Sequence, residues 1–253
     1  MDKPLVSVIM PAYNAESYIE AAIVSVQNQT VKNWELLVMD DGSSDHTCAV
    51  VEKLAAKDGR VRLMKNPQNM GVAKTRNRAL DLAKGAYVAF LDSDDMWVPQ
   101  KLEKQIARMQ EEKADISYCS YALVDWAGNK TRSDYIVPAK IDYKGLLKEN
   151  VMGCSSVMLS RRVAEKYRFN TDFYHEDYVL WLELLRDGFT AAGCREVLVN
   201  WRFIPDSRSF NKRKSAKNRW RIYRHYLKLP LHKCVWLLGN YAIAGLRKYL
   251  RKH

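Results

Sequence analysis

The sequence predicts an α/β fold built on a mostly parallel sheet, with a smaller helical segment at the C-terminus. Three observations lead to this prediction. In the first half, short β-rich runs alternate with helical patterns, as in βαβ units. Clusters of polar and acidic residues follow several of these runs, where open parallel sheets bind their ligands. The C-terminal part changes composition and becomes strongly basic.

The first half is expected to contain four strands and three helices. Strands are predicted at 5–10, 35–39, 61–65 and 86–91 because these runs are short and apolar. Helices are predicted at 16–28, 45–57 and 73–83. Ser17 and Glu20 have the spacing of a capping box at the first of these helices.

The second half is less regular. Residues 116–124 and 130–137 are expected to pair as a hairpin across Ala127, Gly128 and Asn129. A short strand is predicted at 155–159 and a last strand at 197–203. A helix is expected from Glu176 to Asp187, because Gly188 can end it. The composition changes near residues 205–212.

Composition and cysteine content exclude several classes of protein. The chain has 253 residues, of which 47% are hydrophobic and 28% charged, so disorder is excluded. The five cysteines are odd in number and contain no CxxC, which argues against a disulfide framework and a structural zinc site. We expect a reducing compartment. No stretch has the roughly 18 to 20 apolar residues that a membrane-spanning helix needs.

The positive charge is concentrated at the C-terminus. The net charge of the chain is +12. From Arg202 onward there are 15 Lys and Arg residues and one acid, so this part carries +14 and the rest −2. A basic segment of this kind favours a polyanionic partner, either phospholipid or nucleic acid. The alternative is a solvated tail that only aids solubility.

Clustered carboxylates predict a divalent cation. They repel one another unless something positive lies between them, and oxygen ligands suit Mg²⁺ or Mn²⁺. The clusters are Asp40 and Asp41, then Asp92, Asp94 and Asp95, and later Glu176 and Asp177. The alternative for Asp94 or Asp95 is that it caps the following helix. Neither a G-x-G-x-x-G nor a P-loop motif occurs, so glycine-rich phosphate cradles are not expected.

Five motifs resemble, in order and spacing, those of family-2 glycosyltransferases of the GT-A fold. They span about residues 4–210 and begin at Pro11, Asp40, Asn69, Leu91 and Glu176. They read PAYN, DDGS, NMGVAKTRN, LDSDD and ED. The resemblance implies an inverting transfer from a nucleoside-diphosphate sugar, usually a UDP-sugar, with Mn²⁺ or Mg²⁺.

The resemblance also implies a donor site. Asp41 is expected to accept a hydrogen bond from uracil, Asp92 to contact the ribose or the metal, and Asp94 to ligate the metal. The residues expected around the donor are Ala12, Tyr13, Asn14, Asp41, Gly71, Lys74, Arg76, Asp92, Ser93 and Arg202.

On the acceptor side, Asp177 is the expected general base. An acceptor hydroxyl has a high pKa, so a carboxylate must accept its proton as the new bond forms. Trp181, one helical turn further on, is a candidate apolar wall for the acceptor sugar, with plain core packing as the alternative. His175 and Glu176 are further candidates for acceptor contacts.

The expected organisation is a GT-A domain over residues 1–210 and a basic amphipathic tail over 211–253. Within the domain, residues 1–98 would bind the nucleotide sugar and 99–210 the acceptor. Trp220, Tyr223 and Leu227 fall on one helical face, which suits a helix lying in a membrane interface. The alternatives are that this face packs on the body or forms a homodimer contact.

The resemblance extends to bacterial enzymes of O-antigen or capsule assembly. It implies a polyprenyl-diphosphate-linked sugar as acceptor and a peripheral position at the cytoplasmic face of the inner membrane. No nucleic-acid partner is expected, because the motifs of the catalytic half are explained without nucleic-acid binding. Two other functions stay open: the same chemistry on a soluble or protein acceptor, and a non-catalytic nucleotide-sugar-binding or membrane-recruitment module. The presence of Asp94 and Asp177 argues against the last.

Overall fold

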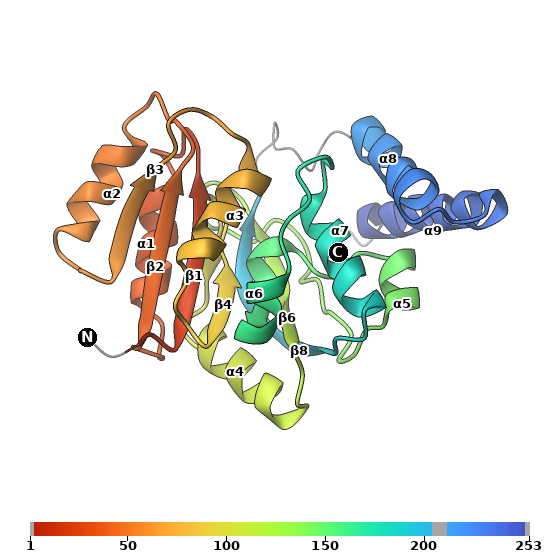
Figure 1. Cartoon of the computed structure of the whole chain (residues 1–253), viewed down its shortest axis with the longest axis horizontal. Coiled ribbons are helices and arrows are strands. Elements are labelled where there is room, and N and C mark those ends of the chain that lie inside the picture. Colours follow the sequence, from red (N-terminus) through yellow and green to blue (C-terminus); the bar gives the residue numbers. More distant parts are fainter. Residues whose placement is uncertain (1–2, 204–211, 251–253) are drawn as a thin grey trace.

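A computed structural model describes residues 3–203 and 212–250 of the chain, and within them the fold is built on one mixed sheet (Figure 1). The strand order is β3-β2-β1-β4-β7-β6-β8-β5. The strands are β1 Val6–Ala12, β2 Trp34–Asp40, β3 Val61–Lys65, β4 Tyr87–Phe90, β5 Met96–Trp97, β6 Ile116–Val124, β7 Met158–Ser160 and β8 Ala191–Arg202. The expected α/β class is therefore confirmed.

The first half forms the parallel part of the sheet. Strands β3, β2, β1 and β4 run parallel, with β1 between β2 and β4. Helix α3 (Val72–Leu82) packs on the face that presents Ile9, while α1 (Ile19–Gln27) packs on the face that presents Val8. Alternate residues of a strand point to opposite faces, so each strand contributes to both hydrophobic clusters. This arrangement brings the carboxyl ends of β1, β2 and β4 to one edge.

The second half adds antiparallel strands. Strand β7 pairs antiparallel with β4 and β6, whereas β8 pairs parallel with β6 and antiparallel with β5. The expected hairpin after β6 is reduced to isolated bridges at Lys130 and Tyr135. The strand expected at 155–159 begins later, because a 3₁₀ turn, Cys154–Ser156, comes first. Strand β8 starts at Ala191, earlier than expected.

The remaining helices cover the sheet and its C-terminal side. They are α2 Thr47–Ala55, α4 Lys101–Glu111, α5 Tyr143–Lys148, α6 Arg161–Lys166, α7 Glu176–Arg186, α8 Lys212–Arg221 and α9 Leu231–Leu250. A π-helical segment, Ile222–Tyr226, continues α8. The five cysteines are all free thiols, as expected.

The capping box expected at the first helix is wrong. Helix α1 begins at Ile19 after Tyr18, with no side-chain cap. The preceding turn is fixed instead by contacts with the residues at the start of α2. There the Ala15 amide donates to Thr47 Oγ1 (2.7 Å) and the Glu16 amide donates to Asp45 Oδ2 (3.1 Å).

The C-terminal helices pack on the body (Figure 1). Tyr223 is fully buried, and its hydroxyl donates to the Leu147 carbonyl oxygen (2.9 Å). Trp220 and Leu227 are partly buried against the same cluster, so the alternative of packing on the body holds for this row of residues. Among the described residues, no helix combines the length and apolarity that crossing a membrane requires.

Candidate active site

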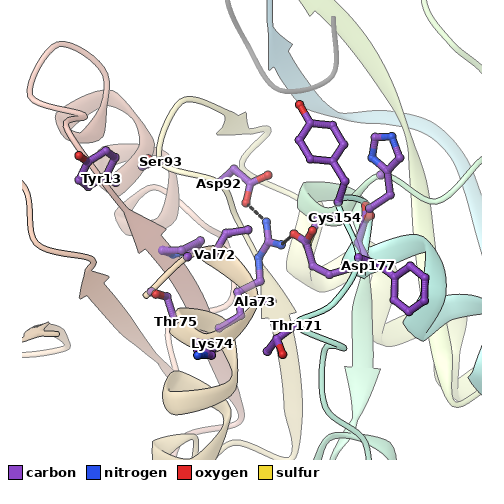
Figure 2. A pocket seen from close by; sticks show the side chains of 18 of the residues that line it. Tyr13, Val72, Ala73, Lys74, Thr75, Asp92, Ser93, Cys154, Thr171 and Asp177 are labelled. Carbon is purple, nitrogen blue, oxygen red and sulfur yellow. Dashed lines mark hydrogen bonds and ion pairs between the residues drawn. The ribbon is translucent and has the colours of Figure 1, made fainter. Parts of the chain in front are cut away.

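A cavity of about 1070 Å³ opens at the carboxyl ends of the parallel strands. Its walls come from the ends of β1, β4 and β8, the first turns of α3 and α7, and parts of α8 and α9. In Figure 2, Tyr13 and Asp177 lie on opposite sides of the view with Asp92 between them. The cavity therefore joins the segments that carry the five motifs.

Asp41 holds the loop between β3 and α3 in place. Its Oδ1 accepts hydrogen bonds from Asn66 Nδ2 (2.6 Å) and the Met70 amide (2.9 Å), and its Oδ2 accepts one from the Gly71 amide (2.8 Å). Gly71 has φ +84°, a conformation that favours glycine. Asp41 lines the cavity, but most of its hydrogen-bonding capacity serves the loop.

The PAYN segment divides between the cavity and the fold. Ala12 and Tyr13 line the cavity, and Tyr13 is half exposed. Asn14 is not among the lining residues. Its Oδ1 accepts from the Ser44 amide (2.9 Å), and its φ of +47° lies in the left-handed region that asparagine tolerates. The side chain of Asn14 thus fixes the turn beside the cavity, and its expected contact with the base stays a prediction.

Arg76 joins the two halves of the site. Its buried guanidinium bonds Asp92 Oδ1 (2.5 Å) and Glu176 Oε1 (2.7 Å), and the dashed lines of Figure 2 mark these ion pairs. Arg76 lines the cavity, yet its guanidinium is already paired with two carboxylates of the protein itself. Its geometry is that of a clamp between the end of β4 and the start of α7.

The acids after β4 serve two different purposes. Asp95 is buried, accepts from Ser155 Oγ (2.5 Å) and the Arg202 amide (3.0 Å), and supports the fold. Asp94 faces the cavity with Asp92 and Ser93. Burial and the Asp92 charge raise the pKa of Asp94 to about 6. Asp94 is therefore a carboxylate whose ionised form is disfavoured by burial and by the Asp92 charge.

These residues fit a divalent cation. Mg²⁺ is usually held by one or two carboxylates together with substrate phosphates and water. Asp92 and Asp94 supply two neighbouring carboxylates that line the cavity, and the charge of Asp92 disfavours ionisation of Asp94. Within residues 3–203 and 212–250, no group of three or more His, Cys, Asp or Glu side chains could hold a metal alone. A cation bound here would take its remaining ligands from the donor and from water.

The ED motif forms the first turn of α7, facing the cavity. Asp177 Oδ1 accepts from the Tyr178 amide (2.7 Å). Burial and the neighbouring Glu176 charge raise the pKa of Asp177 to about 6. His175 and Glu176 also line the cavity, but Glu176 is engaged by Arg76. Asp177 is thus a carboxylate with a raised pKa that lines the cavity.

Trp181 does not reach the cavity. It is fully buried among Phe90 and Phe169, with ring centroids 6.0 and 6.1 Å away, and it is absent from the cavity lining. Trp181 does lie one helical turn after Asp177 on α7, but at that position the side chain points into the core. Assignment of Trp181 to the acceptor is therefore wrong, and the core alternative holds.

Two further cations expected near the donor also line the cavity. Lys74 is exposed on α3, and Arg202 is buried at the end of β8. The Arg202 guanidinium lies 5.0 Å from the Tyr18 ring centroid. The rest of the loop after Arg202, residues 204–211, lies outside the described residues.

The sequence did not point to one wall of the cavity. Ser215, Arg219 and Tyr241, from α8 and α9, line it together with Tyr121 and Trp201. The change in composition and the basic charge place these C-terminal residues in the tail, not in the site. One signal was available: no Asp or Glu lies within four residues of Arg219 along the chain.

Comparison with known proteins identifies the family. The model of glycosyl transferase family 2 matches residues 7–169. A Bacillus subtilis protein named for teichuronic acid biosynthesis, glycosyltransferase TuaG, is 38% identical over 98% of both chains. The Escherichia coli UDP-Glc:α-D-GlcNAc-diphosphoundecaprenol β-1,3-glucosyltransferase WfgD is 41% identical, covering 98% of this chain and 96% of its own.

Solved structures agree on the fold. S. aureus TarS 1–349 in complex with UDP-GlcNAc is similar with a TM-score of 0.73 and 20% identity, over 94% of this chain and 71% of that one. The mannosyltransferase PcManGT from Pyrobaculum calidifontis, in complex with GDP-Man and Mn²⁺, has a TM-score of 0.70 and 19% identity, over 96% and 74%. The chain therefore belongs to glycosyl transferase family 2, as a glycosyltransferase of the GT-A fold.

Proposed function

We propose that the protein transfers a sugar, with inversion, from a UDP-sugar to a hydroxyl of a polyprenyl-diphosphate-linked glycan in bacterial polysaccharide biosynthesis. The observation that carries the proposal is the single cavity that unites Asp41, the Asp92–Asp94 pair and Asp177. The names of TuaG and WfgD support the polysaccharide setting and the lipid-linked acceptor.

In this proposal the donor lies along the β1, β4 and α3 side. Ala12 and Tyr13 contact the base and ribose, and Asp41 retains capacity to accept the uracil N–H. Lys74 and Arg202 face the diphosphate. Asp92 and Asp94 hold Mn²⁺ or Mg²⁺, which when bound offsets the charge that develops on the leaving diphosphate. The Mn²⁺ complex of the similar PcManGT structure supports this metal role.

Asp177 is the proposed general base. Its carboxylate accepts the proton of the acceptor hydroxyl as that oxygen bonds to the anomeric carbon, while the nucleoside diphosphate leaves from the opposite face. One displacement of this kind inverts the anomeric centre. Burial raises the pKa of Asp177 to about 6, which makes it a stronger base than an exposed aspartate and leaves it ionised near neutral pH.

The outward face of α9 is the proposed contact with the membrane surface. Leu231, Val235, Trp236 and Ile243 are each at least half exposed along it. The exposed bases Arg224 and Lys228 lie close by in sequence, and such a combination suits anionic headgroups. In this proposal the protein is peripheral, at the cytoplasmic face of the membrane that holds its acceptor. We expect Trp236→Asp to reduce co-sedimentation with anionic liposomes, whereas unchanged co-sedimentation would contradict this contact.

The proposed reaction is tested with UDP-glucose and N-acetylglucosamine linked through diphosphate to a short alkyl chain, the headgroup in the name of WfgD. The expected product has a β-linked sugar, because inversion of the α-linked donor gives β. The anomeric coupling constant in the NMR spectrum of the product reports this directly. A product with the α configuration would contradict the single-displacement mechanism.

A further inference from the structure

Arg219 is a buried cation on the C-terminal wall of the cavity. Its side chain lies between two tyrosine rings, with the guanidinium carbon 4.4 Å from the Tyr178 centroid and 4.3 Å from the Tyr241 centroid. Its Nη1 donates to the Tyr223 hydroxyl (3.1 Å). Only 7% of the residue is exposed, yet it lines the cavity. The packing holds the guanidinium in a fixed place.

In the part of the chain that the structure describes, no carboxylate pairs with this charge. Among residues 3–203 and 212–250, Arg219 forms no ion pair, and its Nε has no hydrogen-bond acceptor. Arg76, which is equally buried, has two carboxylate partners. Buried charges are normally paired, because an unpaired one loses its hydration without compensation. Arg219 therefore lacks the anion that Arg76 has.

The surroundings of Arg219 are built for a polar ligand. Ser215, one turn earlier on α8, lines the cavity and is 2% exposed. Its hydroxyl has no hydrogen-bond partner in the described structure. The Nδ2 of the buried Asn218 is likewise without an acceptor there. Two of these buried donors, Ser215 Oγ and Arg219 Nε, belong to residues that line the cavity. An anionic ligand with several oxygens can satisfy such donors.

A second buried arginine, Arg202, lines the cavity and forms no ion pair within 4 Å among the described residues. Arg202 is 6% exposed and its Nε also lacks an acceptor. Its charge acts on Asp94, so it belongs to the side assigned to the donor diphosphate. The proposed reaction brings together two diphosphates, one on the donor and one on the acceptor. Arg202, whose charge acts on Asp94, and Arg219, on the α8 wall, match these two groups.

We propose that Arg219, together with Ser215 and Tyr241, binds the diphosphate of the lipid-linked acceptor. This inference rests on the proposed function and names how the acceptor is selected. The diphosphate anchors the acceptor on the α8 and α9 wall, and its first sugar then extends toward Asp177. The C-terminal helices are thus part of the substrate site as well as a candidate membrane contact.

The test compares two acceptors: N-acetylglucosamine alkyl diphosphate and the same sugar on the same alkyl chain without phosphates. For Arg219→Gln we expect kcat/KM to fall about 10- to 100-fold with the diphosphate acceptor, the effect of one or two charge-assisted hydrogen bonds. The value for the acceptor without phosphates and the KM for the donor should stay within about twofold. Arg195→Gln, which removes an exposed charge on β8 away from the cavity lining, should leave kcat/KM for both acceptors unchanged.

Arg219→Lys keeps the charge but loses the forked geometry, so its preference for the diphosphate acceptor should be intermediate. This variant decides the matter if Arg219→Gln does not fold. Equal losses on both acceptors would overturn the inference, because they would indicate a structural role. A raised KM for the donor with an unchanged acceptor preference would also overturn it, and would assign Arg219 to the donor.

A direct binding measurement separates this inference from the proposed function. If the wild type transfers sugar to neither acceptor, the proposed function fails. In that case, calorimetric titration of the UDP-loaded protein with the diphosphate acceptor still measures acceptor binding without sugar transfer. Binding that is lost in Arg219→Gln would support the inference, and absence of binding to the wild type would overturn it.

Discussion

Replacement of Arg76 by methionine should strongly destabilise the protein. The guanidinium is buried and pairs with Glu176, which is also buried, and with Asp92, which is partly exposed. Removal of one partner of a buried ion pair costs about 3–5 kcal/mol, because the other charge stays buried without compensation. Solvent screens the Asp92 contact, so we take the lower end, about 3 kcal/mol. For a chain of this size, that lowers the melting temperature by about 6–12 °C.

The assay is urea unfolding of the wild type, Arg76→Met and the double variant Arg76→Met/Glu176→Gln. The double variant should recover part of the loss, since it removes the buried charge that Arg76 leaves behind. Lys65→Met serves as the control, because it breaks an exposed pair with Glu52 and should cost less than about 1 kcal/mol. A cost for Arg76→Met no larger than that of the control would refute the clamp between β4 and α7.

Three further predictions concern the reaction. Asp177→Asn should lower kcat about 100- to 10,000-fold through loss of the base while calorimetry still detects UDP binding; a normal rate would exclude Asp177 as the base. Because Asp177 acts in its ionised form and burial raises its pKa to about 6, kcat should fall below about pH 6 and be level above it. A pH-independent kcat between about pH 5 and pH 8 would contradict this. Asp94→Ala should weaken UDP binding in Mn²⁺ but not in chelator, and equal weakening in both would remove Asp94 from the metal site.

The regular first half of the fold was predictable because its strands are short, apolar and bounded by turn residues. The strand at 61–65 agrees at both ends, and the helix at Glu176 begins where expected. Weak local signals failed where distant contacts decide. The Ser17 and Glu20 spacing did not produce a cap, because contacts with Asp45 and Thr47 fix the turn.

The candidate site was predictable as a set of residues but not as a geometry. The motifs place Asp41, Asp94 and Asp177 at the edge of the sheet, and all three line the cavity. Arg76, by contrast, pairs with carboxylates 16 and 100 residues away, which spacing along the chain cannot reveal. Helical periodicity likewise showed an apolar row in the tail but could not say that it packs on the body.

Release of free nucleoside diphosphate from a panel of nucleotide sugars tests the central claim most directly. Each donor is incubated with the N-acetylglucosamine alkyl diphosphate acceptor, in Mn²⁺ and in chelator. We predict release from a UDP-sugar that requires both the metal and the acceptor. Release that is equal without acceptor, or equal in chelator, would contradict metal-dependent transfer to a lipid-linked sugar in the cavity that Asp94 and Asp177 share.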